Sequence, residues 1–158
     1  LGAERGIESI ESICLEVMIV AAACEENEIA RDFFTVAFQS EMCRDYLRNN
    51  HIERVKRIFK QQCQDWTDEQ FAEAEILVSG IEYATLMTAG DPVPLETRIA
   101  GALNNILGIY GVPEETRQIK LQKVFAMDYI TLGKRVLDEF KQYVTDANDE
   151  AFQALIKR

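Results

Sequence analysis

The residues best suited to chemistry in this chain are one histidine, His51, and the four cysteines at positions 14, 24, 43 and 63. A histidine close to a cysteine can act as the general base for a thiol nucleophile. His51 follows Asn49 and Asn50, however, at the expected boundary between two helices, and helix initiation explains these residue types. Because no Cys-x-x-Cys pair occurs, the tightly spaced ligands of a zinc site are not expected either.

Other catalytic and cofactor-binding patterns are missing from the sequence as well. It contains no Gly-x-Gly-x-x-Gly, no Gly-Lys-Ser/Thr and no Gly-x-Ser-x-Gly. A single histidine cannot supply the two Glu-x-x-His pairs of a di-iron bundle. Acidic pairs such as Glu73 and Glu75 have the spacing of a solvated helix face. These observations predict that the chain is not an enzyme and has neither a metal nor a cofactor.

The charge of the chain limits its partners. Seventeen basic and 27 acidic residues give a formal net charge of −10, and such a field repels the phosphates of nucleic acids. The densest basic cluster fits a solvated helix face, and it comprises Arg54, Lys56, Arg57 and Lys60. The start resembles no signal peptide, and the longest apolar run, 17–24, is far shorter than the roughly 20 residues that span a bilayer. We therefore expect a cytoplasmic protein without a membrane segment.

Apolar residues recur at three- and four-residue steps along most of the chain, which predicts about seven helices and no strand. Thr67 and Gln70 form a capping-box pattern at one helix start, and Gly111 with Pro113 marks one loop. Short connections favour antiparallel neighbours. We therefore expect an all-α, antiparallel multi-helix bundle forming one domain over residues 1–158. The expected helices cover 7–24, 28–48, 52–64, 67–88, 95–110 and 114–144, before a short last one carrying Phe152, Leu155 and Ile156.

The second to fourth expected helices carry many large, adaptable side chains. These side chains either fill the core or surround a cavity for an apolar small molecule, because pockets between helices are mostly apolar with a few polar anchors. Periodicity does not decide between the two. The side chains in question are Phe34, Phe38, Met42, Phe59, Trp66, Tyr83 and Met87, and the candidate anchors are Gln62, Cys63, Trp66 and Tyr83.

Residues 69–113 resemble the paired closing helices in the regulatory half of TetR-family transcriptional regulators. An apolar helix with a central glycine, Gly80, precedes a Gly/Pro loop and a second apolar helix. The resemblance extends over nearly the whole chain, and 113–158 is similar to the extra C-terminal helices of some members, packed on the domain. The helix-turn-helix unit that marks the family does not occur in these residues.

The resemblance implies a homodimeric regulatory domain that binds an apolar effector and acts on DNA only through an N-terminal helix-turn-helix outside this chain. Effector entry would shift the first helix and lower operator affinity, which is a population shift between two arrangements. The effector would bind between the first four helices, near Phe34, Phe38, Met42, Phe59, Cys63, Trp66 and Tyr83. The implied dimer interface comprises Phe71, Ile76, Gly80, Met87, Ile99, Leu103, Ile106 and Tyr110, with Tyr83 a candidate for both sites.

The alternative function is a helical protein–protein interaction module without a small-molecule ligand. The near-heptad spacing of apolar residues along the expected helix 114–144 favours it. A Leu103→Glu substitution is expected to distinguish the two functions. It would convert a dimeric regulator into monomers, whereas an interaction module would be unaffected.

Overall fold

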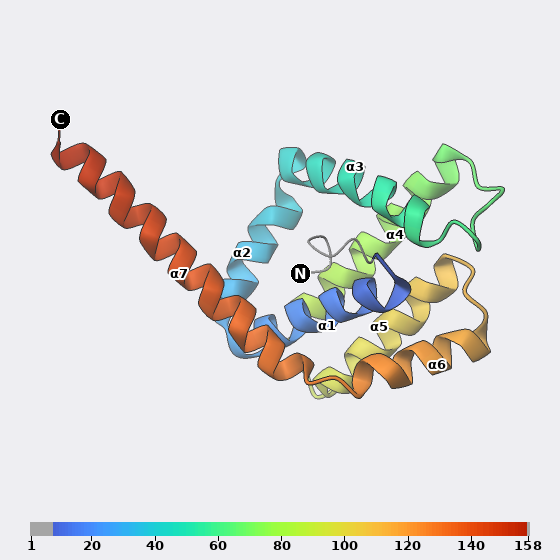
Figure 1. Ribbon diagram of the computed structural model, residues 1–158. Coiled ribbons are helices and arrows are strands. Elements are labelled where there is room, and N and C mark those ends of the chain that lie inside the picture. Colours follow the sequence, from blue (N-terminus) through green and yellow to red (C-terminus); the bar gives the residue numbers. More distant parts are fainter. Residues whose placement is uncertain (1–7, 158) are drawn as a thin grey trace.

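The computed structural model describes residues 8–157, apart from the side chains of Phe140, Val144 and Phe152, and within this range it contains helices and no strand. The predicted all-α bundle of about seven helices is confirmed (Figure 1). The helices are α1 (Ile10–Glu26), α2 (Glu28–Gln39), α3 (Glu41–Ile58), α4 (Asp68–Met87), α5 (Leu95–Ile109), α6 (Glu114–Phe125) and α7 (Tyr129–Ile156).

The local start and stop signals act as the sequence predicts. The Gln70 amide donates to the Thr67 hydroxyl oxygen at 3.2 Å, and the Thr67 amide donates to the Gln70 side-chain oxygen at 2.8 Å. This capping box satisfies two amides at the start of α4 that have no partner inside the helix. Gly111 follows α5 with a φ of 77°, the left-handed conformation that glycine adopts without a steric cost.

The boundary between the second and third helices lies earlier than expected. The break falls at Ser40, whose side chain accepts a hydrogen bond from the Cys43 amide at 3.3 Å and caps α3. Helix α3 then continues through Asn49 and Asn50 to Ile58, so the two asparagines lie inside a helix and do not end one. Their weak preference for caps is overridden by the packing of α3 on α2 and α4.

The predicted helix 114–144 is wrong in its extent, because the chain breaks between α6 and α7. Asp128 caps α7, and its carboxylate accepts from the Thr131 amide at 3.1 Å and from the Thr131 hydroxyl at 2.7 Å. Helix α7 then runs to Ile156 without the expected break at residues 146–148. The near-heptad pattern is therefore shared by two helices and does not form one continuous seam.

Helix α1 is the centre of the bundle and contacts α2, α4, α5, α6 and α7 (Figure 1). Its side chains are buried on several sides, which is why its apolar stripe is so wide. Three of the four cysteines, Cys14, Cys24 and Cys63, are buried among apolar residues, whereas Cys43 on α3 is exposed. The three buried thiols thus fill space as small apolar side chains.

Gly133 lets α7 approach α1 closely. A Cβ atom at this position would lie 3.0 Å from the Ile19 carbonyl oxygen and 3.2 Å from the Ala22 Cβ. Beyond this contact, the C-terminal part of α7 projects away from the other helices (Figure 1). Tyr143 and Leu155 are accordingly exposed to 71% and 68%. Of the expected extra C-terminal helices, α6 and the first part of α7 pack on the bundle, and the last part of α7 does not.

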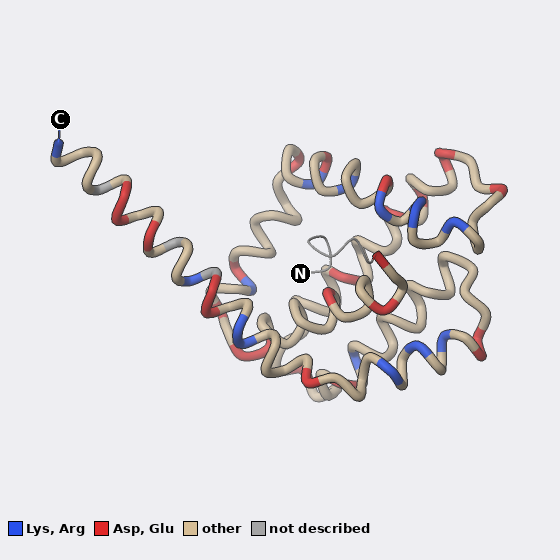
Figure 2. Tube along the Cα trace, viewed as in Figure 1, with Lys and Arg blue, Asp and Glu red and all other residues tan. Residues whose placement is uncertain are grey.

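Three residues of the basic cluster, all on α3, form ion pairs with acidic neighbours, and basic and acidic positions are intermixed along the chain (Figure 2). Arg54 pairs with Glu16 at 2.5 Å, and Arg57 pairs with Glu8 at 2.8 Å. Lys56 pairs with Asp68 at 2.9 Å. These side chains therefore form ion pairs with α1, with the residue Glu8 that precedes it, and with α4.

Candidate ligand-binding cavity

A cavity of about 860 Å³ lies between α1, α2, α3 and α4. This volume falls within the range of small-molecule sites in proteins, which is roughly 300–1,000 Å³. Mostly apolar residues of α1 and α2 form one side of its wall, where the Phe34 and Phe38 side chains project at adjacent turns of one helix face. The third and fourth helices contribute most of the polar residues of the wall, and Glu16 of α1 adds one more.

The structure brings some of the candidate ligand-binding residues to this cavity. Phe34 and Phe38 of α2 and Met42 of α3 line it, and Met42 is 80% exposed, at the open side. Tyr83 does not line the cavity. Its ring packs edge-on against Phe38 at 5.5 Å, so it supports a residue of the wall from α4.

Phe59, Cys63 and Trp66 lie elsewhere, in the core against the end of α5. The Phe59 ring stacks on Tyr110 at 4.3 Å, and the Cys63 thiol donates to the Tyr110 carbonyl oxygen at 3.4 Å. Trp66 packs against Phe71 and Tyr110. Because α3 ends at Ile58, the segment that follows it turns toward α5 and not along the cavity. For these three residues the structure corrects the placement expected from the sequence.

The sequence analysis missed a polar wall on one side of the cavity, which comprises His51 of α3 and Glu75, Ser79 and Glu82 of α4. Glu16 of α1 and Arg44 and Arg48 of α3 also line the cavity. His51 Nδ1 lies 2.6 Å from Glu75 Oε2, and the Ser79 hydroxyl donates to Glu75 Oε1 at 3.4 Å. Glu75 is only 5% exposed, so it does not belong to the solvated face that was expected for it. A signal was present, because residues 75, 79 and 82 fall on one face of α4 within the stretch 74–84, which is otherwise apolar.

Burial and neighbouring charge shift the pKa values at this wall. Burial by itself lowers the pKa of His51, but the hydrogen bond and the charge of Glu75 outweigh it, and the pKa is raised above its ordinary value. Burial raises the pKa of Glu82 to about 7, against the opposing effect of His51. Glu82 has no hydrogen bond or ion pair within the part of the chain that the structure describes. The wall therefore holds one paired and one unpaired carboxyl group.

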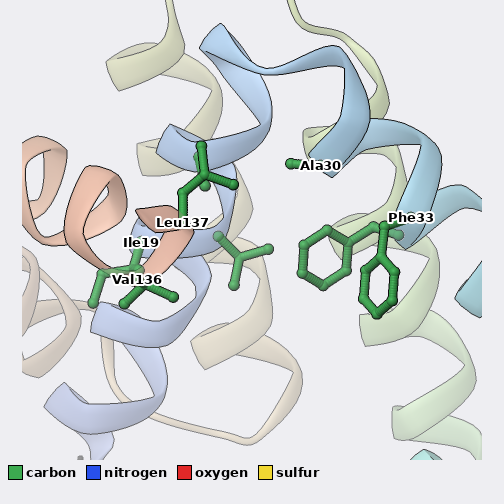
Figure 3. Close-up of a pocket in the computed structure, with 8 residues that line it drawn as sticks. Ile19, Ala30, Phe33, Val136 and Leu137 are labelled. Carbon is green, nitrogen blue, oxygen red and sulfur yellow. The ribbon is translucent and has the colours of Figure 1, made fainter. Parts of the chain in front are cut away.

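A smaller apolar cavity of about 100 Å³ lies between α1, α2 and α7. Figure 3 shows Ile19 of α1, Ala30 and Phe33 of α2, and Val136 and Leu137 of α7 around it. Phe33 and Phe34, whose rings meet edge to face at 5.4 Å, line both cavities. This pair of rings thus connects the wall of the large cavity with the packing of α7.

Most of the candidate dimer-interface residues are buried within the chain itself. Phe71 is 6% exposed, and Ile99, Leu103, Ile106 and Tyr110 are at most 1% exposed. The structure corrects their placement, because these side chains pack inside the bundle and are not available to a second subunit.

The other four interface candidates lie on α4, and one of them, Tyr83, is 37% exposed. Met87 is half-buried and accepts a hydrogen bond from the Thr35 hydroxyl at 2.9 Å, whereas Ile76 is 56% exposed and Gly80 is exposed. With the exposed Leu77 and Ala84, Ile76 and Gly80 form an apolar stripe on α4 that faces away from the core.

Comparison with known proteins gave no match. No family model matches the chain, and neither a curated protein nor a solved structure is significantly similar to it. Within residues 8–157, no group of three or more His, Cys, Asp or Glu side chains is arranged to hold a metal ion. None of the described helices is both long enough and apolar enough to cross a membrane.

Proposed function

We propose that this chain is the regulatory domain of a TetR-type transcriptional regulator and that its effector binds in the large cavity. The observation that carries the proposal is the position of this cavity of about 860 Å³ between α1, α2, α3 and α4. The resemblance of the sequence implies an effector site between these same four helices. In this proposal the protein is cytoplasmic and contacts DNA only through a helix-turn-helix outside this chain.

Helix α1 is the element through which the effector acts in this proposal. Ile13, Val17 and Val20 project from α1 into the cavity, and the opposite sides of the helix pack on α5, α6 and α7. An effector that contacts α1 favours one position of this helix over another, and only this difference in affinity shifts the equilibrium. In the whole regulator, α1 would transmit the shift to the DNA-binding unit.

The proposed homodimer uses the exposed apolar stripe of α4, formed by Ile76, Leu77, Gly80 and Ala84. Gly80 has open space where a side chain would be, so a helix of a second subunit can come close. A twofold contact of this kind uses the same surface on both copies. This stripe replaces the interface that included the buried residues of α5.

The dimer is tested with Ile76→Glu, because Leu103 is fully buried and its replacement would unfold the chain. Sedimentation velocity should show a dimer for the unmodified chain and a monomer for Ile76→Glu. The matched control is Ile119→Glu on α6, a residue that is 65% exposed and lies outside the stripe. Equal dissociation of both variants, or a monomeric unmodified chain at micromolar concentration, would exclude this interface.

Effector binding is tested by thermal shift with decan-1-ol as an apolar probe. A ligand present at 100 times its dissociation constant stabilises the native state by about 2.7 kcal/mol. Ala37→Trp places a large ring at the cavity wall and should abolish the shift. Ala151→Trp, on the projecting part of α7, should leave it intact. A shift that is equal in both variants would place the probe outside the cavity.

The second candidate function is a protein–protein interaction module, and the projecting part of α7 favours it. Tyr143, Leu155 and Ile156 are exposed there to 71%, 68% and 62%. Exposed apolar side chains on a helix are typical of surfaces that bind another protein. If this function holds, Leu155→Glu should abolish capture of a partner, and Ile76→Glu should not affect it.

A further inference from the structure

The charges of the polar wall do not cancel. His51 and Glu75 form a close pair at 2.6 Å, in which a protonated imidazole and a carboxylate compensate each other. Glu82, one helical turn beyond Ser79 on α4, lines the same cavity without a hydrogen-bond or ion-pair partner among the described residues. Once ionised, Glu82 therefore leaves this wall with an unbalanced negative charge.

Other charged groups at the cavity do not compensate Glu82. The charged neighbours that shift the pKa of Glu82 are His51, Glu75 and Glu16. Glu16 of α1 is already paired with Arg54. Arg44 and Arg48 line the cavity from earlier turns of α3, outside the group that acts on Glu82, and α2 contributes only apolar residues.

Resting on the proposed function, we infer that the effector is an amphipathic cation whose apolar body lies between α1 and α2 and whose amine binds at Glu82. An ammonium group supplies the positive counter-charge that the half-buried Glu82 carboxylate lacks, and an unpaired carboxylate removed from water is otherwise costly. Phe34 and Phe38 line the same cavity, and aromatic faces attract cations as well as apolar chains. An anionic effector would instead meet Glu82 and Glu75 at this wall.

The test compares three probes with the same ten-carbon chain, namely decylamine, decan-1-ol and decanoate, by isothermal titration calorimetry at pH 8. Decylamine is protonated and Glu82 is ionised at this pH, so we expect decylamine to bind at least about tenfold more tightly than decan-1-ol. Decanoate should bind most weakly. The Glu82→Gln variant should bind decylamine and decan-1-ol with similar affinity.

A matched control variant separates the effect of Glu82 from the general attraction between a cation and an acidic protein. Glu73→Gln, an exposed position on the same helix, reduces the net negative charge by the same amount and should leave the preference for decylamine unchanged. Proton release gives a readout that does not depend on a variant. At pH 7, close to the pKa of Glu82 at about 7, the binding of decylamine should release roughly half a proton from the Glu82 carboxyl group. Calorimetry in two buffers of different ionisation enthalpy measures this release.

The outcomes separate this inference from the proposed function. If none of the three probes binds, the effector site itself is refuted. If decan-1-ol binds and decylamine binds no more tightly, releasing no proton, the cationic effector is refuted while the cavity remains a ligand site. If decanoate binds most tightly of the three probes and the Arg48→Ala variant loses this binding, the cationic effector is also refuted. Recognition would then be assigned to the arginines of α3. Should Glu82→Gln fail to fold, the probe preference and the proton release of the unmodified chain still decide.

Discussion

His51 of α3 and Glu75 of α4 share a hydrogen bond of 2.6 Å across the polar wall of the cavity. The pair joins two helices that pack on each other, and Glu75 is 5% exposed. His51 is also the only histidine of the chain, so its imidazole signals in an NMR spectrum need no assignment. The pKa of this one side chain thus reports on the state of the whole wall.

We predict that NMR titration gives a pKa for His51 above its ordinary value of 6.5 and that Glu75→Gln lowers it. Because the folded pKa is raised above the unfolded one, the pair stabilises the fold fully below about pH 6.5. This stabilisation is lost as the pH rises through the folded pKa. An unshifted pKa, or one that Glu75→Gln leaves unchanged, would show that the pair does not form in solution.

Glu82→Gln is expected to stabilise the protein at pH 8 and to have little effect at pH 5. Burial raises the folded pKa of Glu82 from 4.5 to about 7, so the native state holds more protons than the unfolded state between these values. Stability therefore falls as the pH rises through this interval, by roughly 3 kcal/mol in total.

Urea denaturation of the Glu82→Gln variant at pH 5 and pH 8 measures this effect. Glu73→Gln on the exposed side of α4 is the control and should show no such pH dependence. A Glu82→Gln variant that gains no stability at pH 8 would mean that Glu82 ionises without a cost in the native state.

Replacing Gly133 should separate α7 from α1. In Gly133→Leu, the new side chain meets the Ile19 carbonyl oxygen and Ala22, which are already about as close as a Cβ allows. Overpacking of this kind costs roughly 1–3 kcal/mol. Gly101→Ala on α5 is the control, because nothing lies within 4 Å of its Cβ and the better helix propensity should stabilise by up to about 1 kcal/mol. Equal urea midpoints for the two variants would contradict the close contact.

Only one of the four thiols should react rapidly with Ellman's reagent in the native protein. Cys43 is exposed, whereas burial raises the pKa of Cys14 to about 12 and that of Cys24 to about 11. Cys63 is buried as well, and its pKa is raised. Because the thiolate is the reactive form, the three buried thiols should react only on unfolding.

The Cys43→Ser variant provides the control for this count and should show no rapid phase. Cys43 also lines the large cavity, so saturating decan-1-ol should slow its reaction in the unmodified chain. Two or more rapidly reacting thiols would indicate that the core around α1 opens more easily than the structure implies.

The sequence by itself determined the helical architecture, because helix formation and capping depend on residues within a few positions of one another. The capping box of Thr67 and Gln70 begins α4, and Gly111 ends the turn after α5 with a positive φ. The recurrence of apolar residues at steps of three and four positions predicted the number of helices. Local spacing did not predict the helix break at Ser40 or the one before Asp128. At these positions the local preferences for a helix end are weak, and tertiary packing determines where the helix breaks.

Only the tertiary structure decided what each apolar or polar face contacts. The spacing of Ile99 and Leu103 is the same for a face buried in the core and for one buried in a dimer, and the structure places both residues in the core. The polar wall depends on His51 and Glu75, which are 24 positions apart and meet only because α3 packs on α4. Periodicity within one helix carries no information about a partner on another helix, so the cavity and its unpaired Glu82 emerged only when the helices were assembled.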